Sequence, residues 1–281
     1  MNVRRMAAVL AVGAMVPLSA AALPRSSHMD GCRKSAGSIA VFQMDARDAH
    51  GAGTRDCVDG AAATGAAVWT AAGRHGGAFT FDGTKLLAVQ DANFANIGTG
   101  DFTLMAWVRA IPSTHGLTVF SKDLPNNSTR RGYALILNGP FWNNVRFHDA
   151  DHPENHTRVY FTANVIDSQW HHVAVSIDRD EGAVAYVDGN VVPSWIAGLP
   201  LIEQSGSLAT TEPLIIGSSG LGLENPFVGS IDEVRVVGAA LSRCQVRWLA
   251  GYPYDDGIAS SFDPSNVLPE PVCSALTILP I

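Results

Sequence analysis

Segments that alternate between hydrophobic and polar residues recur from about residue 37 to residue 238, and turn residues separate them. Alternation with a period of two is typical of half-buried β-strands. The expected strands are 39–45, 78–81, 85–89, 102–109, 118–120, 133–137, 144–147, 158–162, 170–177, 183–187, 214–216 and 231–237. About a dozen short strands with almost no helix predict an all-β fold, an antiparallel β-sandwich.

Two Asp-Gly pairs mark expected turns, because this dipeptide is a strong signal for a hairpin. We expect 78–81 and 85–89 to pair around Asp82-Gly83, and a second hairpin within 170–187 that closes on Asp188-Gly189. The segment 102–109 is apolar on both faces, which suits a central strand of stacked sheets.

One helix is expected, from residue 242 to residue 250. Ser242 can cap its N-terminus, and Gly251 and Pro253 end it. Residues 252–281 contain five prolines and little periodicity, so we expect an irregular C-terminal tail there.

The N-terminus has the organisation of a secretory signal peptide. Arg4 and Arg5 precede an apolar run over 6–22 that ends in small residues, and this run is short for a membrane span. A membrane anchor is the alternative, but no basic flank follows the run. We therefore expect a signal peptide at 1–22, one domain at 30–251 and a secreted protein.

The chain is acidic, with 19 Lys and Arg against 26 Asp and Glu and a net charge of −7. Cleavage of the signal peptide would remove two arginines and no acid. An acidic surface is poorly suited to nucleic acid or to an anionic membrane. We expect neither nucleic-acid binding nor membrane insertion.

Four cysteines fit an exported protein: Cys32, Cys57, Cys244 and Cys273. An even number of cysteines in an oxidising compartment predicts two disulfides, for which three pairings are possible. No Cys-x-x-Cys motif accompanies them, which argues against zinc.

Six short motifs occur in one order along the chain. They cover 41–45, 73–83, 100–107, 170–175, 185–189 and 229–236. In this order they resemble the concanavalin A-like jelly roll and, within it, the laminin-G-like family of bacterial secreted domains. The resemblance covers roughly residues 37–250 and implies a concanavalin A-like antiparallel β-sandwich with one short C-terminal helix. This fold hosts lectins, adhesion modules, glycan hydrolases and lyases, so the fold does not fix the function.

The resemblance also implies that the first and last strands lie side by side and antiparallel, which brings Asp45 near Asp232. Cys32 lies 13 residues before Asp45, and Cys244 lies 12 residues after Asp232. The two cysteines would then arrive at the same end of the fold. The preferred pairs are Cys32–Cys244 and Cys57–Cys273.

Families that resemble this chain often hold a structural Ca²⁺ at this place. Asp45 and Asp232 would supply carboxylate oxygens, and carbonyls of the turn at Gly76-Gly77 would complete the shell. The alternative is that both carboxylates bind backbone N–H groups without a metal.

Two exposed-looking turns contain candidate sugar-binding residues, because sugar sites combine aromatic faces with polar side chains. Trp142 stands beside Asn143 and Asn144, and Trp195 follows a proline turn. The alternative for Trp142 is a loop residue folded back on the sandwich.

A second polar run spans 148–156 and contains His148, Asp149 and Asp151. These side chains could line a ligand site, and a solvated hairpin loop is the alternative. The candidate ligand-binding residues are therefore Trp142, Asn143, Asn144, His148, Asp149, Asp151 and Trp195.

Catalytic motifs are absent from the sequence. Glucanases of the resembling superfamily carry Glu-x-Asp-x-(x)-Glu on one strand face, and none of the seven glutamates here has Asp two positions later. We expect a secreted, non-catalytic binding or adhesion module, a lectin-like protein with a carbohydrate as its partner. The alternatives are a polysaccharide lyase or glycoside hydrolase with an unrecognised active site, and a structural envelope protein.

Overall fold

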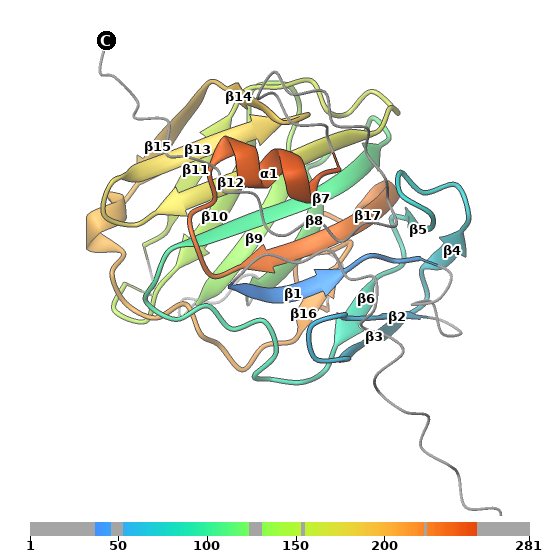
Figure 1. Ribbon diagram of the computed structural model, residues 1–281, viewed down its shortest axis with the longest axis horizontal. Coiled ribbons are helices and arrows are strands. Elements are labelled where there is room, and N and C mark those ends of the chain that lie inside the picture. Colours follow the sequence, from blue (N-terminus) through green and yellow to red (C-terminus); the bar gives the residue numbers. More distant parts are fainter. Residues whose placement is uncertain (1–36, 46–52, 124–130, 153–154, 222–223, 252–281) are drawn as a thin grey trace, which may run out of the picture.

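The computed structural model describes residues 37–45, 53–123, 131–152, 155–221 and 224–251. The chain forms two stacked antiparallel sheets (Figure 1). Sheet A has the order β14 (Asn190–Val192), β13 (Gly182–Val187), β12 (His171–Asp178), β7 (Phe102–Ala110), β17 (Val228–Val237), β5 (Ala78–Asp82) and β4 (Val68–Thr70), and β1 (Ser38–Phe42) also pairs with β17. Sheet B has the order β15 (Ser194–Gly198), β11 (Thr157–Phe161), β10 (Asn143–His148), β9 (Gly132–Leu137), β8 (Leu117–Asp123), β16 (Leu214–Ile216), β6 (Leu87–Val89), β3 (Ala62–Gly65) and β2 (Gly53–Arg55). The predicted antiparallel β-sandwich is confirmed.

The main core lies between the two sheets, because alternate side chains of each strand point inward. In β11, Val159 and Phe161 are buried in this core. In β7, Phe102 and Leu104 belong to the same core, whereas Met105 lies in a second cluster beneath the helix. Strand β7 is therefore buried on both faces, as its apolar pattern predicts.

Helix α1 (Arg243–Leu249) covers part of the outer face of sheet A. Ser242 Oγ accepts from the Gln245 N–H, and the Gln245 side chain reaches back to the Ser242 N–H, which makes a capping box. Val246 and Leu249 pack in the second cluster. Figure 1 shows α1 lying across β12 and β7. No helix in the described part of the chain is both long enough and apolar enough to cross a membrane.

The two predicted hairpins have different outcomes. Strands β12 and β13 pair in register, and Asp188-Gly189 makes the following turn into β14 with φ of 52° and 72°, as expected for a two-residue hairpin. The expected hairpin of 78–81 with 85–89 is wrong: β5 belongs to sheet A and β6 to sheet B. The turn after Asp82 forms, but the chain crosses there from one sheet to the other, because each strand finds a different partner.

The first and last strands are neighbours, as the resemblance implies. Val41 lies opposite Arg235 and Phe42 opposite Val234 in antiparallel register. The pairing of β17 with β7 shifts between Asp232 and Arg235, and Glu233 in this bulge has φ of 52°. A bulge turns the strand locally and re-aims its side chains.

Three predictions lie partly or wholly outside the described residues. The signal peptide at 1–22 and the C-terminal tail at 252–281 are among them, and so are two of the four cysteines, at 32 and 273. Neither Cys57 nor Cys244 is a free thiol in the structure. The two disulfide pairings therefore stay predictions.

Core packing gives a first testable outcome. Phe147 is fully buried and meets Phe102 edge to face, with 5.3 Å between ring centroids. Replacing Phe147 by Ala should lower the free energy of unfolding by about 3–5 kcal/mol, because the site cannot collapse around the lost ring. Urea unfolding measures this loss. Phe141→Ala is the control, since Phe141 is 59% exposed, and a similar loss in both variants would contradict the burial described here.

Candidate functional site

Three aromatic side chains meet at the edge of sheet B, where β15 is the outermost strand. The Tyr160 and Trp195 rings stack with 5.3 Å between centroids and 20° between planes. The Trp142 ring stands nearly perpendicular to both, 5.6 Å from Tyr160 and 6.0 Å from Trp195. Trp142 is 54% exposed and Trp195 is 40% exposed. We call Trp142, Tyr160 and Trp195 the aromatic corner.

Strand register places the aromatic corner on the outer face of sheet B, away from the core. Tyr160 lies directly opposite Trp195 across β11 and β15, and its neighbours Val159 and Phe161 point into the core. Trp142 ends the turn before β10, where the Asn144 side-chain amide donates to its carbonyl at 3.0 Å. These strands lie at the left of Figure 1.

Polar side chains lie on the same face beside the aromatic corner. Asn144 is opposite Tyr160 and almost fully buried, and no described residue donates a hydrogen bond to its side-chain oxygen. Arg158 donates from Nη1 to the Tyr160 hydroxyl at 3.0 Å. Neither Tyr160 nor Arg158 was among the sequence candidates. Their alternation with Val159 and Phe161 was the signal that could have found them.

Asn143, a predicted ligand-binding residue, faces the opposite way. Its side chain is buried, accepts from the Asn138 N–H at 3.0 Å and donates to the Ala163 carbonyl at 2.9 Å. Both ends of this amide therefore bind backbone, one at Asn138 in the turn before β10 and the other at Ala163 after β11.

The other predicted ligand-binding residues lie at the far end of β10. His148 ends the strand, and Asp149 and Asp151 follow it. Five residue steps separate positions 143 and 148, or about 16 Å at roughly 3.3 Å per residue. The structure therefore does not bring His148, Asp149 and Asp151 to the aromatic corner.

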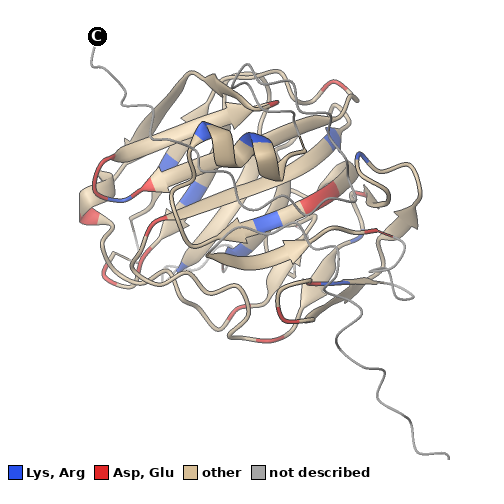
Figure 2. Cartoon of the chain, in the orientation of Figure 1, with Lys and Arg blue, Asp and Glu red and all other residues tan. Residues whose placement is uncertain are grey.

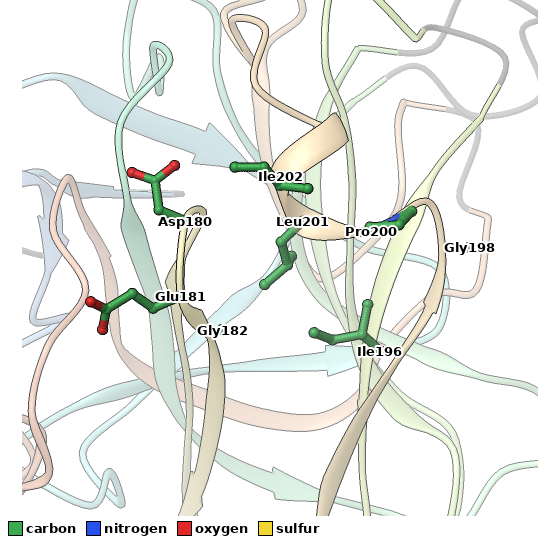
Figure 3. A pocket seen from close by; sticks show the side chains of 8 residues that line it. All are labelled: Asp180, Glu181, Gly182, Ile196, Gly198, Pro200, Leu201 and Ile202. Carbon is green, nitrogen blue, oxygen red and sulfur yellow. The ribbon is translucent and has the colours of Figure 1, made fainter. Parts of the chain in front are cut away.

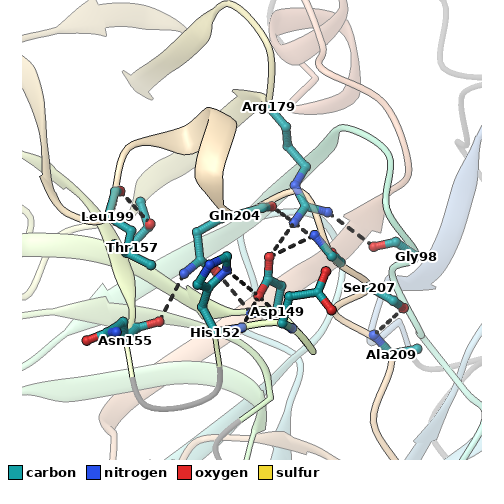
Figure 4. Close-up of polar contacts among 12 residues, drawn as sticks. Gly98, Asp149, His152, Asn155, Thr157, Arg179, Leu199, Gln204, Ser207 and Ala209 are labelled. Atoms are coloured by element: carbon teal, nitrogen blue, oxygen red, sulfur yellow. Dashed lines mark hydrogen bonds and ion pairs between the residues drawn. The ribbon is translucent and has the colours of Figure 1, made fainter.

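Asp149 organises the loop that follows β10 (Figure 4). Its carboxylate is fully buried, with Oδ1 accepting from the N–H groups of Asp151 and His152 and Oδ2 accepting from the Gly206 N–H. The Arg179 guanidinium lies 3.9 Å from Oδ2 and donates to the carbonyls of Gly98 and Gly206. These contacts give Asp149 a structural role, and its burial differs from the solvated loop named as the alternative.

Asp45 and Asp232 hold the two sides of one turn, as the pairing of β1 with β17 implies. Asp232 Oδ2 accepts from the N–H groups of Arg74 and His75, each at 2.9 Å. Asp45 Oδ1 accepts from the Gly77 N–H at 3.2 Å. The two carboxylates thus approach the same backbone turn.

The two carboxylates of this turn could supply only part of the ligand shell of a hard cation. Asp232 Oδ1 is buried and has no hydrogen-bond partner in the described part of the chain, and burial and the Glu233 carboxylate raise the pKa of Asp232 to about 8. A Cβ at Gly76 would lie 1.8 Å from Asp45 Oδ1, so only glycine leaves room there. The described residues contain no cluster of three or more His, Cys, Asp or Glu at metal-binding distance. A cation here would therefore need backbone carbonyls besides the two carboxylates.

A family model described as the concanavalin A-like lectin/glucanases superfamily, of the laminin-G type, matches residues 81–247. The chain belongs to this superfamily. The resemblance stated from the sequence motifs is thereby confirmed. No curated protein matches the chain.

Solved structures share this concanavalin A-like fold at low sequence identity. The binding domain of Paraclostridial Mosquitocidal Protein 1 has a TM-score of 0.57 at 14% identity, over 76% of this chain and 52% of that chain. The binding domain of botulinum neurotoxin serotype G has a TM-score of 0.55 at 14% identity, over 75% of this chain and 50% of that chain. The chain thus spans about half the length of these two toxin domains.

A third structure matches over nearly its whole length. It is domain 4 of AbnA, a GH43 extracellular arabinanase from Geobacillus stearothermophilus, in complex with arabinotriose. The TM-score is 0.54 at 18% identity, over 76% of this chain and 98% of that chain. At such identities the likeness shows the fold alone.

The outer face of sheet A in this concanavalin A-like sandwich carries a different, buried cluster. The Trp107 ring lies edge to face with His75 and His172, and its Nε1 donates to the Ala250 carbonyl at 3.2 Å. Burial lowers the pKa of His172 to about 3. Since α1 ends at this cluster, its aromatic rings serve the packing of the helix.

A pocket of about 420 Å³ opens beside β15 (Figure 3). Ile196, Leu201 and Ile202 line it together with Asp180 and Glu181. Because side chains alternate along β15, Ile196 belongs to this pocket and Trp195 to the aromatic corner. The residues that line the pocket include no aromatic ring, in contrast to the corner.

The buried His172 gives a prediction on pH dependence. Its imidazole is neutral in the fold, whereas in the unfolded chain it takes up a proton near pH 6.5. The unfolded state therefore binds more protons between pH 6.5 and about 3, so the contribution of His172 to stability is lost as the pH falls through this window. The facing charged groups are Arg235, Asp188 and His75.

We expect His172→Gln to remove this pH-dependent loss. Between pH 7 and pH 4.5, the free energy of unfolding of the wild type should fall by about 2.5 kcal/mol more than that of the variant, since one proton is worth about 1.4 kcal/mol per pH unit. Urea unfolding at both pH values measures the difference. Equal falls in the two proteins would show that His172 is not buried in its neutral form.

Proposed function

We propose that this chain is a secreted, non-catalytic carbohydrate-binding or adhesion module that binds a glycan at the aromatic corner. The observation that carries the proposal is the meeting of Trp142, Tyr160 and Trp195 on one exposed edge, with two indoles at least 40% exposed. Aromatic faces pack against the apolar face of a sugar ring, and neighbouring polar groups select its hydroxyls. Asn144, with an unpaired buried oxygen, is such a group.

The exposed aromatic area supports binding, because scattered apolar residues on a surface need no explanation but a gathered patch does. Phe141, which precedes Trp142 in the chain, is exposed as well. The arabinanase domain of the same fold was solved with arabinotriose, and the two toxin domains are binding domains. These relatives support a binding role for this chain.

The distribution of carboxylates supports a non-catalytic role. Glycoside hydrolysis uses two carboxyl groups that flank the scissile bond. Within the nine strands of sheet B, Asp123 is the only carboxylic acid, and it forms an ion pair with Arg146. Secretion is supported by the signal-peptide pattern at residues 1–22.

A glycan array, run with and without Ca²⁺, tests this function. The array should identify a bound glycan, and Trp195→Ala should weaken its binding at least tenfold, a loss of about 1.4 kcal/mol. Isothermal titration calorimetry against that glycan measures the change. Trp142→Ala should have an effect in the same direction.

A matched control is Trp170→Ala. Trp170 directly precedes β12 of sheet A, and the Arg109 guanidinium lies 5.5 Å from the centre of its ring. This variant should bind the glycan within twofold of the wild type. Binding by wild type and Trp195→Ala with equal affinity would reject the aromatic corner, and no binding to any glycan would reject the proposed function.

We further propose a structural Ca²⁺ between Asp45, Asp232 and the carbonyl of Gly76. The unpaired buried oxygen of Asp232 and the close approach of Asp45 to Gly76 support it. The Gly76 carbonyl accepts the Gly73 N–H at 3.3 Å and keeps a second lone pair. A cation would compensate two carboxylates that the fold brings to one turn.

The calcium proposal predicts that Ca²⁺ raises the melting temperature. A ligand at one hundred times its Kd stabilises the native state by about 2.7 kcal/mol. Asp232→Asn should abolish the Ca²⁺-dependent shift, and Asp82→Asn should keep it, because Asp82 is exposed and pairs with Lys85. Thermal unfolding in Ca²⁺ and in chelator measures both variants, and an unchanged wild-type melting temperature would reject the site.

A further inference from the structure

We propose that the glycan bound at the aromatic corner carries a carboxylate, as in a uronic acid, and that Arg158 binds it. This inference rests on the proposed function and names the substrate class of the same site. It is carried by the hydrogen bonds of Arg158, by its neighbours in the sheet and by the balance of charge on this face.

Arg158 has a guanidinium edge without a partner. It lies two residues before Tyr160 on the same face of β11, and Nη1 donates to the Tyr160 hydroxyl at 3.0 Å. Among the described residues, Nη2 has no hydrogen-bond acceptor, and Nε is buried and has none either. Nε and Nη2 form the side of the guanidinium that fits the two oxygens of a carboxylate. A carboxylate in this place would satisfy both donors.

The cross-strand neighbour of Arg158 is another arginine. Arg146 lies directly opposite it on β10. Like charges that face each other across a sheet are destabilising. Arg146 is compensated by a buried ion pair with Asp123 and by Ser219. Arg158 has no ion pair with any residue that the structure describes, so one positive charge on this face lacks a counter-ion.

The neighbour of Arg158 on its other side is a small residue. Ala197 lies opposite Arg158 on β15, and its methyl group covers little of the sheet surface. Positions 158 and 160 are about 6.6 Å apart along the strand, which is roughly the size of one sugar ring. A ring at Trp195 can therefore direct an acidic substituent to Arg158.

The charges around Arg158 do not favour polyanions in general. The chain as a whole has a net charge of −7, and Figure 2 shows acidic and basic residues spread over strands and loops alike. A general attraction of polyanions is therefore not expected. An acidic glycan would bind through one defined guanidinium, with a salt dependence of a single ion pair.

The test compares the same polysaccharides with and without their carboxyl groups. The probes are polygalacturonate, alginate and hyaluronan, each also after chemical reduction of its carboxylates to alcohols, and dextran sulfate with dextran. The full chain should bind at least one carboxylated probe tenfold or more tightly than the reduced form of that probe. Arg158→Gln should bring the two affinities within twofold while binding to the reduced form persists.

Two further variants sharpen the result. Arg158→Lys keeps the charge and loses the two-donor edge, so it should keep only part of the preference. Arg55→Gln is the matched control, since Arg55 lies on β2 at the opposite edge of sheet B and donates to the Gly60 carbonyl. It should preserve the full preference.

Each contrary result has a distinct meaning. Equal or tighter binding of the reduced probes would overturn the carboxylate and leave the glycan-binding function standing. Binding of dextran sulfate alone would overturn it in favour of a sulfated glycan. A preference that survives in Arg158→Gln would remove Arg158 from the site. Absence of binding to every probe and to the glycan array would overturn the proposed function itself.

Discussion

The structure depends on the burial of alternate side chains between two sheets. In β11, Val159 and Phe161 enter the core, and this fixes Tyr160 and Arg158 on the outer face. A slip of one residue would reverse every side chain of the strand, so the core determines the register and the register determines the candidate site. The same hydrophobic packing that stabilises the sandwich thus positions the aromatic corner.

The two outer faces of the sandwich are used differently. On sheet A, α1 and its apolar residues cover the central strands, and Trp107 is buried between two histidines near the end of the helix. On sheet B, aromatic rings at the β15 edge stay exposed. Tryptophan rings therefore pack against a helix on one face and form a candidate ligand surface on the other. The difference is that α1 covers the rings on sheet A.

Charged residues in the sandwich differ in whether a neighbouring residue compensates their charge. Asp149 is buried with Arg179 and several backbone N–H groups, and Asp123 is buried with Arg146, so the cost of removing these charges from water is offset locally. Arg158 is next to such a pair and has no counter-ion among the described residues. A departure from local compensation is typical of a binding site, where a ligand supplies the missing group.

Much of this fold could be predicted from the sequence, since alternation, the turn at Asp188-Gly189 and the cap at Ser242 are local signals that local structure obeys. The sequence also indicated Trp142 and Trp195 as candidate ligand-binding residues. Not every pairing was predicted: β5 and β6 flank an Asp-Gly turn and yet join different sheets, because pairing depends on contacts far apart in the chain. Tertiary structure alone stacked Tyr160 on Trp195 and set Arg158 opposite Arg146, since cross-strand register is decided by the shared core and by no single segment.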